Sequence, residues 1–140
     1  MKQINVVAAV LLNKKKEVLC FQKGEHKHPY ITNKYEFPGG KVEAGESEEE
    51  AIQREIKEEL TCSITPVKHL ITVQHSYPDF KIALSAYLCK METEELNLQE
   101  HKQVIALPPT SQQFLNLDWA AADVPISQEI YRLANANLLL

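Results

Sequence analysis

The stretch from Tyr35 to Cys62 constrains the fold of this chain more than any other. It holds three of the four glycines and nine of the glutamates. Pro38-Gly39-Gly40 predicts a turn that closes a short extended piece. Ser47 and Glu50 have the spacing of a capping box, in which each residue satisfies a free backbone N–H of the other. A helix is therefore predicted to begin near Ser47.

Within this helix, an apolar stripe and an acidic flank lie side by side. Ile52, Ile56 and Leu60 recur every four residues and form the stripe. The acidic flank contains Glu48, Glu55, Glu58 and Glu59. Because the stripe would face a protein core, the flank is expected to lie at the boundary between core and solvent.

The position of the acids decides how they are interpreted. The first-turn acids, residues 48–50, complement the helix dipole and are explained as a solvated face. Glu58 and Glu59 lie in the last turn, where the dipole disfavours anions, and Glu55 and Glu59 are like charges four residues apart. Stability alone would not select this arrangement. Binding of a hard divalent cation such as Mg²⁺, which prefers carboxylate and phosphate oxygens, would explain why this arrangement is present.

These residues also carry a family resemblance. Gly40, five residues, Glu46, seven residues and then Arg54-Glu55-Ile56-Lys57-Glu58-Glu59 resemble the signature of the Nudix hydrolases. Every charged position of that signature is matched. Thr61 stands where the signature has glycine, and Cys62 where it has an aliphatic residue. A threonine enters the left-handed conformation less readily than glycine, so the exit of the helix is expected to differ from the family pattern.

Composition restricts the class of protein and of partner. A chain of 140 residues is one domain of common size. A net charge of −4, with acids gathered in one helix, argues against a nucleic-acid duplex as partner. Val6 to Leu12 is too short for a membrane span and its lysines follow it, so it is expected to be a buried strand. No membrane association is predicted.

The three cysteines predict the compartment. They are odd in number, form no C-x-x-C pair and lie in apolar contexts: Cys20, Cys62 and Cys89. Small buried thiols of this kind suit a reducing environment. A cytoplasmic location is therefore expected.

Hydrophobic patterns along the chain predict two β-hairpins and two further helices. The first hairpin joins residues 4–12 to 17–21, and the second joins residues 63–74 to 81–91 through a turn at Tyr77-Pro78-Asp79-Phe80. Residues 24–34 are predicted to be a binding loop, because they lack any regular pattern. Pro108-Pro109 is expected to stop any regular element.

The C-terminal quarter is predicted to be helical. A short helix is expected at residues 111–115 and a longer one at 124–137, with Asp123 as its N-cap and Pro125 in its first turn. Strands, helix, strands and helix predict an α+β or layered α/β/α domain. The family resemblance implies a Nudix-type α/β/α sandwich with a mixed central sheet, spanning residues 1–140 as a single domain.

The resemblance extends to the MutT-like branch of the family. Residues 33–41 are similar to the approach to the signature in that branch. Residues 117–126 are similar to the C-terminal segment of its small nucleoside triphosphate pyrophosphohydrolases, of the 8-oxo-dGTP and CTP types. The last three residues, 138–140, are apolar and would either seal the core or meet a partner.

The resemblance implies a cation site made from oxygen ligands. Its expected members are Gly40 through its carbonyl, Glu55, Glu58, Glu59 and Glu100. Mg²⁺ is the expected cofactor, with Mn²⁺ as a possible substitute. The absence of a side chain at Gly40 would let the backbone approach the metal closely.

The spacing of the residues does not by itself assign every catalytic role. Arg54 is expected to hold a carboxylate by a bidentate pair and fix its aim, while Glu46 braces the loop. The carboxylate that takes a proton from water is left open between a signature glutamate, Glu55 or Glu58, and Glu100. Glu100 is equally well explained as a surface acid, and the aromatic residue that usually follows it in the family is replaced by Ile105.

Substrate contacts are expected from cations and aromatic rings. The candidates are Lys23 and Lys41 for phosphates, Gly39 for close backbone approach, Phe37, Tyr77, Phe80 and Trp119 for stacking on the base, and Ser127 or Gln128 for reading its edge. Readers of 8-oxoguanine in this branch hold an amide side chain near the start of the last helix. With Ser127 or Gln128 at that place, no strong preference for 8-oxo-dGTP is expected.

The chain is therefore predicted to be a Mg²⁺-dependent hydrolase that cuts a nucleoside triphosphate to the monophosphate and pyrophosphate. Hydrolysis of ADP-ribose or another nucleoside diphosphate derivative is an alternative. A third possibility is a non-catalytic nucleotide-binding module, which the intact set of glutamates argues against. The predicted partner is a small nucleotide, and monomer and homodimer both remain open.

Overall fold

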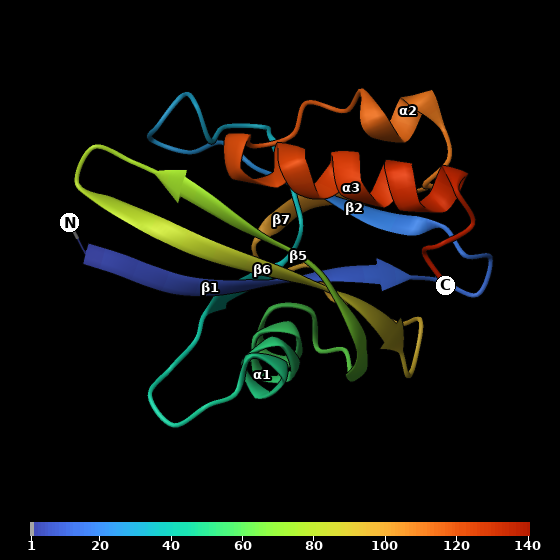
Figure 1. Cartoon of the computed structure of the whole chain (residues 1–140), viewed down its shortest axis with the longest axis horizontal. Coiled ribbons are helices and arrows are strands. Elements are labelled where there is room, and N and C mark those ends of the chain that lie inside the picture. The colour runs from blue at the N-terminus through green and yellow to red at the C-terminus, as the bar shows by residue number, and fades with distance from the viewer. Residues whose placement is uncertain (1) are drawn as a thin grey trace.

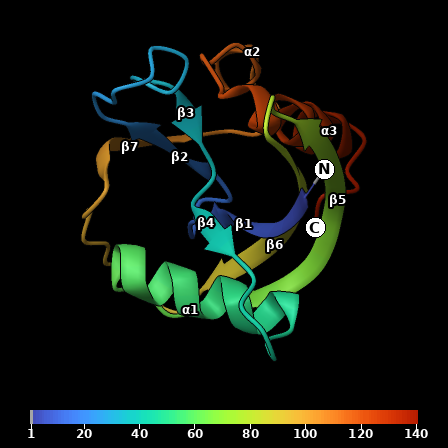
Figure 2. The same ribbon diagram turned by 90° about the vertical axis from the view of Figure 1, so that its left-hand side faces the viewer.

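The computed structural model describes residues 2–140 as one mixed sheet between helices (Figure 1). The strands are β1 Lys2–Leu12, β2 Val18–Lys23, β3 Tyr35–Glu36, β4 Gly39–Lys41, β5 Ile64–Ser76, β6 Phe80–Met91 and β7 His101–Leu107. The helices are α1 Glu48–Leu60, α2 Gln112–Leu115, the single 3-10 turn η1 Ala121–Asp123 and α3 Val124–Asn135. Helix α1 lies on one side of the sheet and α2 and α3 lie on the other (Figures 1 and 2).

The sheet is organised around β1. Its strand order is β3-β2-β1-β6-β5, with β4 also paired to β1 and β7 to β2. Strand β1 runs parallel to β6 from the Lys2↔Phe80 pair to the Leu12↔Lys90 pair. It runs antiparallel to β2 and β4. The α/β/α sandwich with a mixed central sheet is thereby confirmed.

Alternate residues of β1 enter two separate cores, because successive side chains of a strand point to opposite faces. Ala8 and Val10 pack in the cluster beneath α3, which includes Phe114, Ile126 and Ile130. Val7, Ala9 and Leu11 pack in the cluster beneath α1. A strand buried on both faces reads as a continuous apolar run, and this explains the pattern at residues 6–12.

Helix α1 begins as predicted. Ser47 is its N-cap: the Ser47 hydroxyl accepts from the Glu50 N–H at 3.1 Å, and the Glu50 carboxylate accepts from the Ser47 N–H at 2.9 Å. Its buried face is Ala51, Ile52, Ile56 and Leu60. At the other end Thr61 adopts the left-handed conformation, with φ 55° and ψ 36°. The helix therefore exits as one ending in glycine would, although Thr61 carries the steric cost.

Both predicted hairpins are present, since β1 pairs antiparallel with β2 and β5 with β6. Three local expectations are wrong. Gly39–Lys41 is not a turn but the short strand β4, which pairs with Val6 to Ala8 of β1. Strand β7 stands where no strand was expected, paired along β2 from Leu107 to His101. Asp123 makes no capping hydrogen bond to α3, because its side chain turns inward and accepts from the Phe37 N–H at 3.1 Å.

The C-terminal residues close one end of the molecule. Leu139 is buried, whereas Leu138 and Leu140 are 55% and 70% exposed. The Lys68 ammonium donates to the Leu138 carbonyl at 2.9 Å and so ties the tail to β5. Across residues 2–140, the model contains no helix with the length and apolar character needed to cross a membrane.

Candidate active site

The signature helix α1 brings its carboxylates beside β4. Glu55 and Glu59 are partly buried, and the Glu58 side chain is 60% exposed. A side chain on Gly40 would collide with the Glu55 carboxyl group. The Gly40 backbone therefore lies directly against this carboxyl group.

Arg54 holds the acidic cluster in place. Its guanidinium makes a two-point contact with Glu46, from Nε to Oε2 at 2.6 Å and from NH2 to Oε1 at 3.0 Å. The NH1 group donates to Glu55 at 3.0 Å and to Glu58 at 3.4 Å. The Arg54 hydrogen bond keeps the pKa of Glu46 well below its usual range. Glu46 in turn accepts from the Glu43 N–H, so it braces the loop before α1.

The carboxylates on the inner side of the cluster carry raised pKa values. Burial is the main cause for Glu55, offset in part by Arg54. Burial is also the main cause for Glu59, and Glu100 adds to it through a hydrogen bond and its negative charge. The Glu59 Oε2 atom is buried and has no hydrogen-bond partner within residues 2–140. Such an oxygen is available to a cation.

The chemistry of these donors fits a hard divalent cation. They are carboxylates from Glu55, Glu59 and Glu100 beside a glycine backbone, without a thiol or imidazole, and Mg²⁺ prefers such oxygen ligands. Nonetheless, no three acidic, histidine or cysteine side chains within residues 2–140 converge on one point.

A cleft opens from this cluster. Its inner part, of about 320 Å³, is lined by residues that include Lys23, Glu36, Phe37, Gly39, Gly40 and Asp123. Its outer part, of about 660 Å³, is lined by residues that include Tyr30, Gly40, Lys41, Tyr77 and Phe80. Gly40 and Tyr77 belong to both linings. The glycine that contacts the carboxylate cluster thus lies where the two parts meet.

Most predicted substrate contacts line this cleft, but Trp119, Ser127 and Gln128 do not. The hydroxyl of Ser127 is buried and donates to the Val124 carbonyl at 2.9 Å, inside α3. Trp119 is buried and donates from Nε1 to the Phe114 carbonyl, and its ring stacks on Phe37 with centroids 4.6 Å apart. Trp119 therefore supports the cleft wall from behind, through Phe37, whereas Ser127 stays within α3.

Asp123 is a cleft residue that sequence reasoning missed. Complete burial raises its pKa to about 8, although the Phe37 N–H acts against this. A buried acid in a ligand cleft is a candidate for recognition. Asp123 stands before Pro125, where a helix N-cap is expected, and this concealed its place in the cleft. The only sequence signal for that place was its position close to the last helix.

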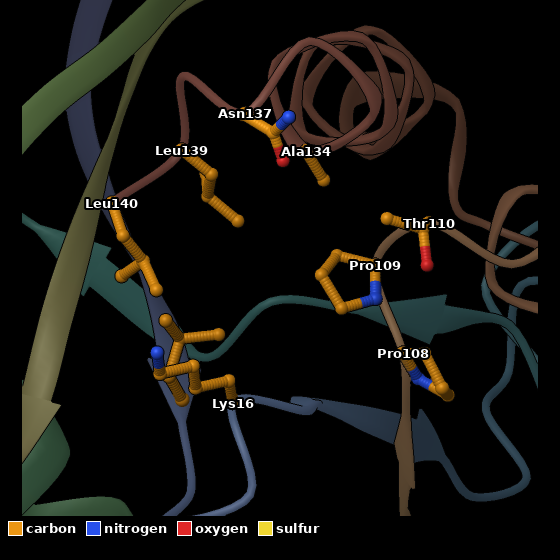
Figure 3. Close-up of a pocket in the computed structure, with 9 residues that line it drawn as sticks. Lys16, Pro108, Pro109, Thr110, Ala134, Asn137, Leu139 and Leu140 are labelled. Carbon is orange, nitrogen blue, oxygen red and sulfur yellow. The ribbon is translucent and has the colours of Figure 1, made fainter.

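A separate cavity of about 310 Å³ lies near the Leu12 end of β1, beside the C-terminus (Figure 3). Its lining includes Lys16, Pro108, Pro109, Leu139 and Leu140. Among residues 2–140, those that line it include no acidic side chain. The chemistry suggested by the carboxylates therefore belongs to the cleft at Gly40.

Comparison with known proteins agrees with this geometry. The family model of the NUDIX domain matches residues 1–133. The 8-oxo-dGTP diphosphatase of Proteus vulgaris is 36% identical over 95 residues, which cover 68% of this chain and 83% of that protein. The CTP pyrophosphohydrolase of Escherichia coli K12 is 29% identical over 137 residues, which cover 98% of each.

Solved structures agree as well. The solution structure of the E. coli ORF135 protein superposes with a TM-score of 0.82 at 29% identity, over 97% of this chain and 94% of that one. A MutT protein from Staphylococcus aureus, described as a Nudix hydrolase, gives 0.71 at 36% identity over 94% and 98%. The chain therefore belongs to the Nudix family, as a MutT-like Nudix hydrolase.

Proposed function

We propose that this protein hydrolyses a nucleoside triphosphate to the monophosphate and pyrophosphate in a Mg²⁺-dependent reaction. The observation that carries the proposal is the position of Gly40, which lies against the Glu55 carboxyl group and lines both parts of the cleft. A nucleotide in the cleft would therefore place its phosphates beside the carboxylates. That is the geometry which phosphoanhydride cleavage requires.

The carboxylates would hold the cation. Glu55, Glu59 and Glu100, with Glu58 turning in from solvent and the Gly40 carbonyl, provide the oxygen ligands. A bound divalent ion supplies charge neutralisation on the phosphates and a lowered pKa for water. The pKa values of Glu55 and Glu59, raised mainly by burial, would fall when a cation lies beside these carboxylates. Mn²⁺ is expected to substitute for Mg²⁺.

The residues of this chain orient the reactants. Arg54 keeps Glu55 and Glu58 aimed, since it is itself anchored on Glu46. Lys23 in the inner cleft and Lys41 in the outer cleft offer cations to the phosphates. The proton of the attacking water is accepted by a signature glutamate, Glu55 or Glu58, or by Glu100.

The base would be recognised in the inner cleft. Phe37 and Tyr77 offer apolar faces, and Asp123 offers a carboxyl group whose Oδ1 is already occupied by the Phe37 N–H. A carboxyl group at this place pairs with the amino group of a base, as acidic side chains do with the N4 amino group of cytosine. Stacking alone would accept every base, so Asp123 is the selective contact.

Cytidine triphosphates are our first choice of substrate. Asp123 fits the amino group of cytosine, and the CTP pyrophosphohydrolase of E. coli aligns with this chain over 98% of its length. 8-oxo-dGTP is the second candidate, favoured by the 36% identity to the P. vulgaris enzyme. Ser127 does not discriminate against 8-oxo-dGTP, because its hydroxyl is occupied inside α3. The proposed ranking relies instead on Asp123.

A nucleotide panel tests the proposal. The kcat/KM values for dCTP, CTP, dGTP, 8-oxo-dGTP, dATP and ADP-ribose would be measured with Mg²⁺, with products separated by chromatography. We expect pyrophosphate with the monophosphate, and dCTP or CTP ahead of the rest. ADP-ribose as the best substrate would overturn the triphosphate assignment. A preference for 8-oxo-dGTP above roughly 10³-fold, beyond what stacking differences supply, would overturn the cytidine assignment.

We further propose that the protein works in the cytosol. All three cysteines are free and buried, and burial raises the pKa of Cys20 and Cys89 to about 12. Buried thiols in this form are inert and match a reducing compartment. Fractionation of cells that produce the protein, followed by immunoblotting, would test the location; recovery from an oxidising compartment would contradict it.

A further inference from the structure

His101 is a buried polar residue for which the reaction outlined above has no use. It is the first residue of β7, and its side chain is 1% exposed. Its ring packs on Phe21, with centroids 5.2 Å apart. The His101 Nε2 atom lies 3.0 Å from Glu36 Oε2, on a different strand of the sheet.

Three strands bring these groups into one row. Strand β2 pairs with β3 through Phe21↔Glu36 and with β7 through Lys23↔His101. Phe21 and Lys23 are two residues apart, so their side chains share a face of the sheet, and a register shift between Gln22 and Lys23 sets His101 opposite Lys23. The Lys23 ammonium lies 3.9 Å from the same Glu36 Oε2. Oε2 is therefore held between His101 and Lys23.

The surroundings define which proton His101 carries. Its Nδ1 atom is buried and has no hydrogen-bond partner within residues 2–140. A proton on Nδ1 would be a buried, unpaired N–H, whereas a proton on Nε2 is donated to a carboxylate. A proton on Nε2 is therefore the one that fits these surroundings. An apolar residue would pack on Phe21 without leaving Nδ1 unpaired, so stability alone does not select histidine here.

Glu36 lies where a carboxylate that is not held in place would oppose nucleotide binding. It lines the inner cleft, and its charge contributes to the raised pKa values of Glu59 at one end and Asp123 at the other. A free anion at this position would repel a nucleotide's phosphates. Lysine is flexible, so an ammonium held in position loses less entropy when it meets a phosphate.

We propose that His101 is a positioning residue for nucleotide binding. It fixes the Glu36 carboxylate, and Glu36 in turn directs the Lys23 ammonium at the substrate phosphates. This inference rests on the proposed function, because it assigns the inner cleft to a nucleoside triphosphate. Loss of the His101 donor frees Glu36, turns its charge toward the phosphates and releases Lys23 to solvent. The defect is therefore expected in KM rather than in kcat.

Three substitutions of His101 distinguish the effect of its N–H donor from the effect of its packing on Phe21. His101→Gln keeps an N–H donor at the position of Nε2, His101→Asn moves the donor to the position of Nδ1, and His101→Leu removes it. We expect KM for the best triphosphate to rise roughly tenfold in the Leu and Asn variants, as for one charge-assisted hydrogen bond. The Gln variant should stay within about threefold of the parent. A Gln variant as impaired as the Leu variant would overturn the proposal.

A double substitution tests the route through Glu36 and Lys23. In a Glu36→Gln background the carboxylate is already lost, so adding His101→Leu should raise KM by less than about twofold. A further rise of roughly tenfold would mean that His101 does not act through Glu36, and would overturn the proposal.

A ¹⁵N spectrum of the His101 ring provides a readout that needs no activity. It should show a proton on Nε2 that shifts when Glu36 becomes Gln, and a proton on Nδ1 would contradict the proposal. A protein that hydrolyses no triphosphate but shows the Nε2–H signal would refute the proposed function, while the His101–Glu36 contact would stand.

Discussion

Glu59 is the α1 carboxylate whose surroundings differ most from those of a solvated acid. It is partly buried beside Glu55 and Glu100, with one oxygen left without a partner within residues 2–140. Without a cation, its charge is opposed by burial and by like charges, and both effects raise its pKa. A residue kept under these conditions is better explained by metal binding than by stability.

We therefore predict that Glu59→Gln lowers kcat/KM by at least about 10²-fold, because it removes a proposed metal ligand. The variant should still fold, because the substitution also removes a charge that repels its neighbours. Turnover and the free energy of unfolding would both be measured. The matched control is Glu49→Gln, in the exposed first turn of α1, which should change turnover less than about twofold. Turnover at the parent level in the Glu59 variant would remove this residue from the site.

Asp123 allows a prediction about pH. Its pKa is raised to about 8 in the folded protein, above that of an Asp in an unfolded chain. The unfolded state therefore loses its proton first as pH rises. The contribution of Asp123 to stability is full below about pH 4 and declines as pH rises toward 8.

Asp123→Asn removes this titration and keeps an oxygen for the Phe37 N–H. We predict that the parent loses a few kcal/mol relative to the Asn variant between pH 4 and 8. Denaturant unfolding across this range measures the difference. The exposed Asp79→Asn serves as the control and should show no such trend. A constant difference between parent and Asp123→Asn would show that Asp123 is ionised throughout.

At the scale of single elements, the exit of α1 is strained. Thr61 holds the left-handed conformation, which costs a residue with a Cβ roughly 1–2 kcal/mol. Its backbone N–H still donates to the Lys57 carbonyl, so the helix end is satisfied. Helix termination requires the conformation, and the sequence provides a residue that adopts it poorly.

We predict that Thr61→Gly raises the free energy of unfolding by about 0.5–1 kcal/mol, since the relief of strain exceeds the added flexibility of the unfolded chain. Thr61→Ala keeps the Cβ and loses the weak contact of the hydroxyl with Gln99 at 3.4 Å. It should therefore give no gain. A Gly variant no more stable than the Ala variant would show that Thr61 is unstrained.

Local patterns predicted the elements that depend on local chemistry. The capping box at Ser47, the apolar stripe of α1 and the two hairpins depend on neighbours in sequence, so they could be read directly. The parallel pairing of β1 with β6 joins residues almost eighty positions apart, and no local pattern encodes it. The family resemblance implied a mixed sheet, but it did not predict which strands run parallel.

Two misses have different physical origins. Strand β7 carries polar residues in its first half and follows an acidic segment, so its sequence shows only a weak strand pattern. Pairing with β2 stabilises the strand where its intrinsic β-propensity does not. Asp123 fitted a helix N-cap by position, but the backbone of Phe37, distant in sequence, captured its side chain. Tertiary hydrogen bonds of this kind cannot be read from spacing.

At the scale of the whole molecule, the sandwich places three groups around one opening. Helix α1 brings carboxylates from one layer, the sheet provides the floor through Gly40 and Lys23, and the turn before α3 adds Asp123 from the other layer. The carboxylates and Asp123 thus come from layers on opposite sides of the sheet, since α1 lies on one side and α3 on the other (Figure 2). The fold forms the site because these layers pack against the sheet at β1 and β4.

The most direct test of this account is the product of dCTP hydrolysis as a function of free Mg²⁺, followed by ³¹P NMR. The account predicts equal amounts of dCMP and pyrophosphate, turnover that rises with Mg²⁺, and its loss in excess chelator, because the unneutralised carboxylates repel the substrate. Restored turnover on adding Mn²⁺ would agree with the oxygen ligand set. Release of inorganic phosphate with dCDP, or full turnover in excess chelator, would contradict it.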